Sequence, residues 1–116
     1  AVDLASLAPP LRHHAAFPEG TNVNVVEVTG PGAARIRSWE RGVEGETLCC
    51  GTGCAVAAAW LAERTGIRAW SLLTASGEAV TVTLEWSAPG RWRDLWLAGP
   101  IRRLGTLELD PGLLPN

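Results

Sequence analysis

The stretch that most constrains this chain is the segment TLCCGTGC at residues 47–54, which leads directly into an apolar helix. That helix, AVAAAWLA, is expected over residues 55–62 and is apolar on every side. A helix without a polar face is normally buried all round. Because its side chains are mostly alanine, strands can approach it closely. It is too short for a membrane span, which needs about 20 apolar residues.

The start of this helix is suited to binding an anion. The first backbone N–H groups of a helix have no partner within the helix, and Gly51 and Gly53 let the backbone come close to a ligand. The same N–H groups would stabilise a thiolate on Cys50. The pattern therefore indicates a reactive sulfur beside a site for a carboxylate. A buried cysteine that only packs is the commoner alternative, and the spacing alone leaves it open.

Strands are expected on both sides of this helix along the chain. Runs of alternating apolar and polar residues, separated by Gly and Pro turns, indicate β-strands. Six runs occur, at residues 22–28, 34–40, 70–74, 79–86, 94–98 and 104–109, with a loop at 41–46 and a Pro-Gly turn at 89–90. The sequence therefore predicts an α+β fold in which a mixed or antiparallel, β-barrel-like sheet wraps around one central helix.

A second, short helix is expected over residues 3–14. Asp3 can cap its start, and leucines follow at positions 4, 7 and 11 with helical spacing. Pro9 and Pro10 interrupt the pattern and can divide this helix into two pieces, because proline has no N–H to donate.

Composition limits the number of domains and the kinds of partner. A chain of 116 residues forms a single domain. Its net charge is −2 and its ten positive charges, all arginine, are spread along the chain, so we expect no nucleic acid partner. The three cysteines lie within positions 49–54 and cannot form a disulfide framework, which favours a reducing, cytoplasmic location. We find no signal peptide or membrane-spanning run, and we expect no metal, because no C-x-x-C or H-x-x-x-H spacing occurs.

Two further segments carry residues that suit a small polar substrate. Arg41 can bind a carboxylate through two parallel hydrogen bonds, and Glu40 can face an ammonium group. The alternative for this pair is a charged strand end in water. Asn22 can donate to and accept from an amino acid, or it can simply cap a turn.

Three ordered segments together resemble a known family. FPEGTNVNVVEV, RSWERGVEGETLCCGTGC and the alanine-rich helix are similar to the C-terminal half of the diaminopimelate epimerases, over about residues 3–109. The resemblance implies two similar domains, each a β-barrel-like sheet around a helix, with the active site between them. It also implies interconversion of LL- and meso-diaminopimelate without any cofactor. Two cysteines would act on opposite faces of the substrate α-carbon, one as a thiolate base and one as a thiol acid.

The resemblance assigns roles to residues at the helix start. It implies that Cys50 is the catalytic cysteine of this half and that the backbone of Gly51 and Thr52 donates to the carboxylate at the reacting centre. Cys49 and Cys54 are departures, because Ala is common at their positions. These two cysteines are expected to pack.

The resemblance also assigns the substrate-binding residues. Asn22 matches a substrate-binding asparagine, and Glu40 and Arg41 match a pair that engages the substrate, Arg41 chiefly at its distal carboxylate. Glu40 is counted with Cys50 among the catalytic residues. The loop at 43–45 is one residue longer than in some members of the family.

The second cysteine that the resemblance implies has no match in this sequence. The chain contains no Met and begins with Ala, so we interpret residues 1–116 as the C-terminal domain of a longer protein. Its three cysteines share one helix start and cannot lie on both faces of a carbon atom. We therefore expect the isolated chain to be inactive.

The expected partners follow from this interpretation. They are diaminopimelate, the N-terminal domain of the same protein, and a second copy in a homodimer; we expect no membrane partner. Two other functions stay open. The chain can belong to a related cofactor-independent amino-acid racemase or isomerase of the same fold, or it can be a catalytically inactive half that only binds or dimerises.

Overall fold

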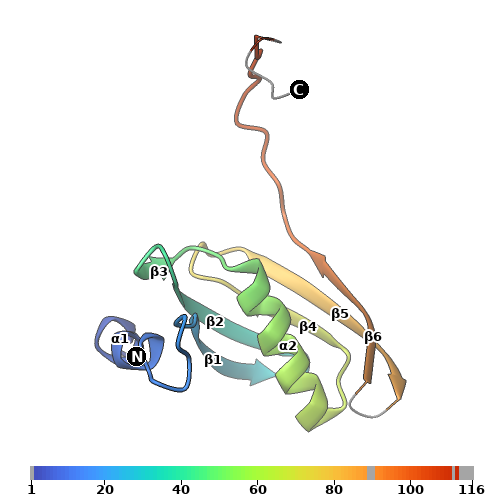
Figure 1. Cartoon of the computed structure of the whole chain (residues 1–116). Helices are drawn as coiled ribbons and strands as arrows, with labels where there is room; N and C mark the ends of the chain where they lie inside the picture. Colours follow the sequence, from blue (N-terminus) through green and yellow to red (C-terminus); the bar gives the residue numbers. More distant parts are fainter. Residues whose placement is uncertain (1, 89–90, 111, 113–116) are drawn as a thin grey trace.

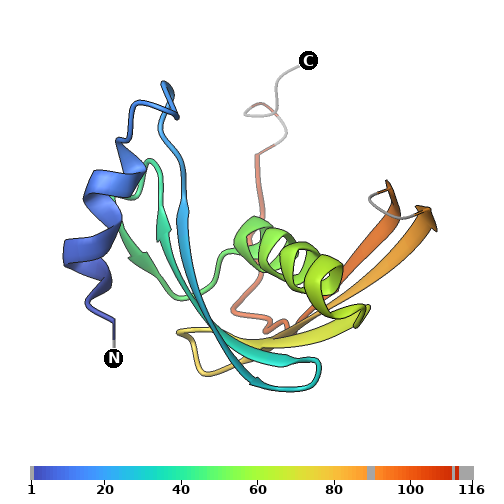
Figure 2. The ribbon, with the colours of Figure 1, turned by 90° about the horizontal axis from the view of Figure 1, so that it is seen from below.

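The computed structural model describes residues 2–88, 91–110 and 112. A curved, mixed sheet of six strands carries a helix on each of its faces (Figures 1 and 2). The elements, in chain order, are α1 (Leu4–Arg12), β1 (Val23–Gly30), β2 (Ala33–Glu40), β3 (Gly45–Thr47), α2 (Gly51–Thr65), β4 (Ala69–Leu73), β5 (Ala79–Ala88) and β6 (Arg91–Ala98). The predicted α+β fold with a mixed sheet and a central helix is confirmed, although the sheet is not closed into a barrel. The described helices are not long and apolar enough to cross a membrane.

The sheet has the strand order β1-β2-β4-β5-β6, and β3 pairs with the end of β2. All pairs are antiparallel except β2 with β4. The chain leaves β2, passes through β3 and α2, and returns as β4. Parallel strands need such a crossover, and a helix usually supplies it. This connection places α2 in the hollow of the curved sheet (Figure 2).

The main core lies between α2 and the sheet. Strands β4 and β5 alternate between buried and exposed residues, so each presents one apolar row to the helix. Full burial of one leucine side chain contributes about 1.5–3 kcal/mol, and several side chains here are fully covered. The buried residues of this core are Ala34, Ile36, Cys54, Ala57, Ala58, Leu61, Ala62, Trp70, Leu72, Val80, Val82 and Leu84.

A smaller core lies on the opposite face of the sheet, under α1. Leu4 and Ala8 of α1 pack there with Val23, and half-buried Val25 and Trp39 complete the cluster. Because side chains alternate along a strand, β1 and β2 serve both cores at once. The two helices therefore lie on opposite sides of the same strands (Figure 2).

The expected division of the first helix is wrong, because α1 runs unbroken through Pro9 and Pro10. Leu7 N donates to Asp3 O before the prolines, and His13 N donates to Pro9 O after them. Asp3 caps the start, as expected, by accepting from Ser6 N. Hydrogen bonds on both sides, together with the buried apolar face, keep the helix continuous across the two missing donors.

The expectation that the central helix is buried all round is also wrong. Val56 and Trp60 on α2 are 65% and 52% exposed. The strands described in this chain cover one side of the helix and leave the other open. The helix is also longer than expected at both ends, and Gly66 ends it in a left-handed conformation, with φ of 75°.

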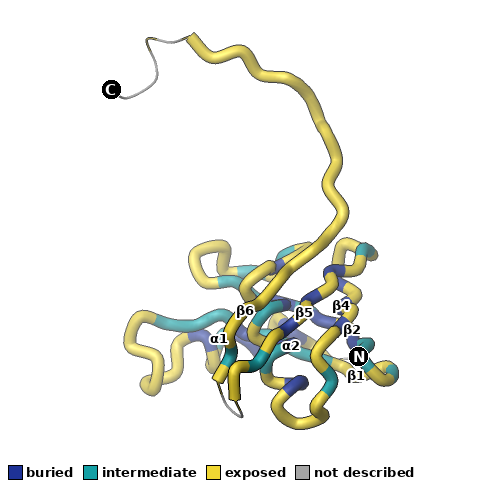
Figure 3. The backbone as a smooth tube through the Cα atoms, turned by 90° about the vertical axis from the view of Figure 1, so that its right-hand side faces the viewer, coloured by how far each residue is buried: buried dark blue, intermediate teal, exposed yellow. Residues whose placement is uncertain are grey.

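Two strand predictions differ from the structure. The expected strand at 104–109 is wrong, because residues 99–110 form a single extended segment that leaves the sheet (Figures 1 and 3). A strand needs a neighbour for its hydrogen bonds, and within the described chain this segment lies away from the sheet. Conversely, the predicted loop at 41–46 contains the start of β3. The predicted turn at 89–90 lies outside the described residues.

We predict that trypsin cleaves the folded chain first after Arg102 and Arg103. Both lie in the extended segment, where Leu104 is 97% exposed and the backbone makes no ladder. Arg35 and Arg93 serve as internal controls, because their side chains are exposed but belong to paired strands. Mass spectrometry of early digests checks this, and early cleavage after Arg35 would contradict the fold described here.

Candidate functional site

The thiol of Cys50 caps the start of α2. Its Sγ accepts a hydrogen bond from Gly53 N at 3.3 Å, and its carbonyl accepts from Cys54 N at 2.9 Å. A side chain that accepts from the third helical N–H satisfies one of the donors left free at a helix start. Cys50 also lies 3.4 Å from Thr52 Oγ1 and is 5% exposed. The thiol is therefore held at one place by the helix it caps.

Gly53 is required for the close packing of α2 against β1. A Cβ atom at this position would lie 2.4 Å from Asn24 Oδ1 and 3.2 Å from Cys50 Sγ. The sequence interpretation gave Gly53 a role in ligand approach, but the residue is buried against β1. Asn24 is held in turn by Ser38 Oγ, which donates to its Oδ1 at 2.7 Å. Sequence reasoning missed Asn24, although a polar residue on the apolar face of its strand is a signal for a buried contact.

Asn22 links the thiol to the segment that follows β2. Its Nδ2 lies 4.0 Å from Cys50 Sγ, and its Oδ1 accepts from Arg41 N at 2.7 Å. One amide group thus faces the sulfur on one side and fixes the backbone of Arg41 on the other. These three residues, which lie far apart in the sequence, come together in the structure.

Glu40 and Arg41 lie at the end of β2. Thr47 Oγ1 donates to Glu40 Oε1 at 2.5 Å, which fixes that carboxylate beside β3. The Arg41 side chain is exposed, and its Nη1 donates to Glu19 O at 3.1 Å. Among the described residues, this is the only hydrogen bond that the Arg41 guanidinium makes, so its other N–H groups remain available to a ligand. Gly51 and Thr52 are exposed at the start of α2, where helix N–H groups lack internal acceptors.

The other two cysteines have contrasting surroundings. Cys54 is fully buried, and burial raises the pKa of its thiol to about 11, with a smaller contribution from the neighbouring Cys49 and Cys50. Cys49 is exposed, so the expectation that it packs is wrong. In the part of the chain that the structure describes, no three His, Cys, Asp or Glu side chains are grouped so as to hold a metal.

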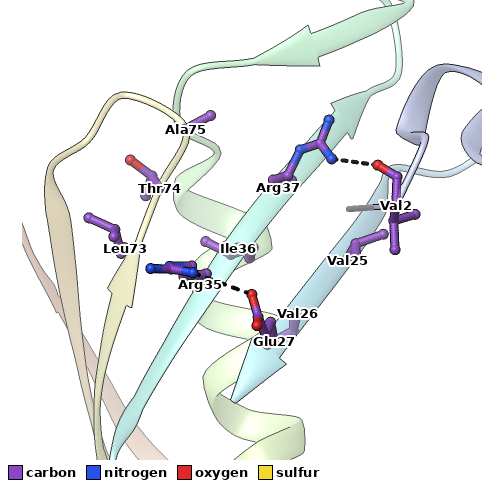
Figure 4. Close-up of a pocket in the computed structure, with 10 residues that line it drawn as sticks. All are labelled: Val2, Val25, Val26, Glu27, Arg35, Ile36, Arg37, Leu73, Thr74 and Ala75. Atoms are coloured by element: carbon purple, nitrogen blue, oxygen red, sulfur yellow. Dashed lines mark hydrogen bonds and ion pairs between the residues drawn. The ribbon is translucent and has the colours of Figure 1, made fainter. Parts of the chain in front are cut away.

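Neither of two cavities in the described chain contains the Cys50 thiol. The larger, of about 700 Å³, lies on the face of the sheet that carries α1 (Figure 4). There Arg35 pairs with Glu27 at 3.7 Å, and Arg37 Nη1 donates to Val2 O at 2.7 Å. The smaller, of about 340 Å³, is lined by the exposed side of α2 and by β1.

The fold and the site define the chain as an α+β domain in which a cysteine caps the central helix and an Asn–Arg pair lies beside it. The chain belongs to the diaminopimelate epimerase family. The family model described as diaminopimelate epimerase matches residues 1–94.

Curated relatives named diaminopimelate epimerase give the same result. The relative from Rhodospirillum centenum is 38% identical over 118 residues, covering 100% of this chain and 38% of the relative. The relative from Chlorobaculum tepidum is 41% identical over 114 residues, covering 93% of this chain and 42% of the relative. The relative from Gemmatimonas aurantiaca is 49% identical over 94 residues, covering 73% of this chain and 32% of the relative. The chain therefore spans less than half the length of each of these relatives.

We predict that, in a Cys49→Ala variant, iodoacetamide labels Cys50 before Cys54. Only the thiolate reacts, and at pH 8 a thiol with a pKa of about 11 is ionised in about one molecule in a thousand. Cys54 is also 0% exposed. Peptide mapping by mass spectrometry measures the order, with the urea-unfolded chain as control. Labelling of Cys54 first in the folded chain would remove Cys50 from the site.

Proposed function

We propose that this chain supplies one acid/base cysteine, Cys50, to a cofactor-independent diaminopimelate epimerase. The observation that carries the proposal is the amide of Asn22, which lies between the Cys50 thiol and the backbone of Arg41. A substrate with a reacting centre and a distal charged end fits such a row of residues. The family membership of the chain supports diaminopimelate as that substrate.

The proposed chemistry is a proton transfer at the substrate α-carbon. The Cys50 thiolate takes the α-proton, which leaves a carbanion and a neutral thiol. A second acid on the opposite face then gives a proton to the carbon, so that the configuration inverts. In the reverse direction the Cys50 thiol gives its proton and becomes the thiolate. No redox step or cofactor is needed, because only protons move.

The other candidate residues bind and orient the substrate. The N–H groups of Gly51 and Thr52 at the start of α2 take the carboxylate at the reacting centre, where the helix dipole favours negative charge. Arg41 takes the distal carboxylate through its planar guanidinium. Glu40 engages a substrate ammonium and is fixed for this role by Thr47.

The second acid comes from another part of the enzyme in this proposal. Cys54 is fully buried, and Cys49 shares the helix start with Cys50. We therefore propose that residues 1–116 are the C-terminal domain, that an N-terminal domain supplies the opposing cysteine, and that the cytoplasmic protein forms a homodimer. The exposed apolar side chains of Val56 and Trp60 support a covering partner.

The isolated chain should not exchange the α-proton of LL-diaminopimelate, because only one of the two proton-transfer groups is present. We expect exchange after the separately expressed N-terminal half is added. Proton NMR in D₂O follows the α-proton signal, and a Cys50→Ala chain is the control. Exchange by the chain alone at the rate of the mixture would exclude the two-cysteine mechanism.

The replacement Arg41→Lys should lower the kcat/KM of the mixture about 5- to 150-fold, because Lys cannot form two parallel bonds to a carboxylate. This factor corresponds to a loss of about 1–3 kcal/mol in transition-state stabilisation. Arg35→Lys is the matched control, since Arg35 is an exposed arginine of β2, the strand that Arg41 follows, and pairs with Glu27 on the α1 face. An Arg41→Lys variant with the kcat/KM of the control would place Arg41 outside the binding site.

A further inference from the structure

A buried arginine joins α1 to the turn between β2 and β3. Arg12 is the last residue of α1 and is 8% exposed. Its Nε and Nη2 both donate to Glu44 Oε1, at 3.2 Å and 2.6 Å. The two residues are 32 positions apart in the sequence, so the pair fixes the turn to a different element of the fold.

Glu44 holds an unusual backbone conformation. Among the described residues it is the only non-glycine residue with positive φ, at 54°. Residues with a Cβ atom rarely adopt a positive φ, because the Cβ atom then crowds the backbone. Its carboxylate accepts from Gly42 N at 3.1 Å as well as from Arg12, and its own N donates to Glu40 O at 2.9 Å. The side chain of Glu44 therefore closes the turn that begins with Arg41.

Arg12 also fixes the segment that precedes β1. Its carbonyl accepts from Thr21 N at 3.2 Å. A Cβ atom on Gly20 would lie 1.5 Å from Arg12 Nη1, so the guanidinium lies directly against the Gly20 backbone. Gly20 has φ of 74° and leaves the space that the guanidinium fills.

The two segments that meet on Arg12 are those that carry the proposed binding residues. Arg41 N donates to Asn22 Oδ1 at 2.7 Å, and Arg41 Nη1 donates to Glu19 O at 3.1 Å. A shift of either segment would change the position of Arg41 relative to Asn22. Arg12 itself is enclosed, with a side chain that is 10% exposed and directed to Glu44.

We propose that Arg12 is a positioning residue, which sets Arg41 and Asn22 for the substrate by holding the β2–β3 turn through Glu44 and the segment before β1 through Gly20. This inference rests on the proposed function. Consistent with a permanently ionised pair, the pKa of the Glu44 carboxyl is lowered by the Gly42 N–H and, next, by Arg12. Glu44 thus stays charged at neutral pH, and the pair would be lost only as the pH falls through that lowered value.

The first test measures hydrogen exchange of the Arg41 amide by NMR in the 116-residue chain. We expect exchange at least tenfold faster in Arg12→Gln and in Glu44→Gln, because the Arg41 N–H loses its fixed position against Asn22. Glu44→Gln leaves the residues of α1 unchanged, so it tests the link even if Arg12→Gln unfolds the end of the helix. Arg37→Gln is the matched control, because Arg37 also makes a two-bond pair with a glutamate, Glu46 of β3, at 2.7 Å and 2.6 Å.

The second test measures the KM for diaminopimelate and kcat in the mixture with the N-terminal half. We expect KM to rise at least fivefold in Arg12→Gln and Glu44→Gln, kcat to stay within twofold, and Arg37→Gln to behave as the unmodified chain. An Arg41 amide that exchanges as slowly as before overturns the inference. So does a KM that is unchanged, or raised equally by Arg37→Gln. A mixture of unmodified halves that exchanges no α-proton overturns the proposed function and, with it, the role of Arg12.

Discussion

Close packing of α2 against the sheet is the constraint on which the rest of the structure depends. The side of the helix that faces the strands carries glycine, cysteine and alanine with a single leucine, and Gly53 allows contact with Asn24 that any larger residue would prevent. Because a packed interior transmits small displacements, the helix start cannot move without moving β1. The thiol of Cys50 is placed by this contact, through the cap that it forms over Gly53.

The two faces of β1 and β2 support different parts of the candidate site. On one face, α2 and its core hold the thiol. On the other face, α1 packs on Val23 and reaches, through Arg12, the turn that follows β2. Asn22 lies just before β1 and meets both sets of contacts. The positions of the Cys50 sulfur and of Arg41 thus depend on two separate cores that share strands β1 and β2.

Sequence patterns predicted what depends on local periodicity and missed what depends on distant neighbours. The alternation in β4 and β5 and the glycine-flanked thiol predicted two strands of the main core and a cysteine at the start of the central helix. Alternation also suggested a strand at 104–109, where no described strand provides hydrogen bonds. Neither pattern nor spacing shows which side of an apolar helix the strands leave open. The pairing of Arg12 with Glu44 spans 32 positions and depends on a positive φ that no residue-type rule assigns to Glu.

The cap at the start of α2 ties the stability of the first helical turn to the protonation of its sulfur. A thiolate accepts a hydrogen bond more strongly than a thiol does. The bond from Gly53 N is therefore tightest when Cys50 has released its proton and weakest when the proton returns. In the proposed reaction, each proton that leaves or returns to this atom would therefore strengthen or weaken the cap at the start of α2. The same end of α2 packs against Asn24 of β1, so the turn that this bond holds is in direct contact with the sheet.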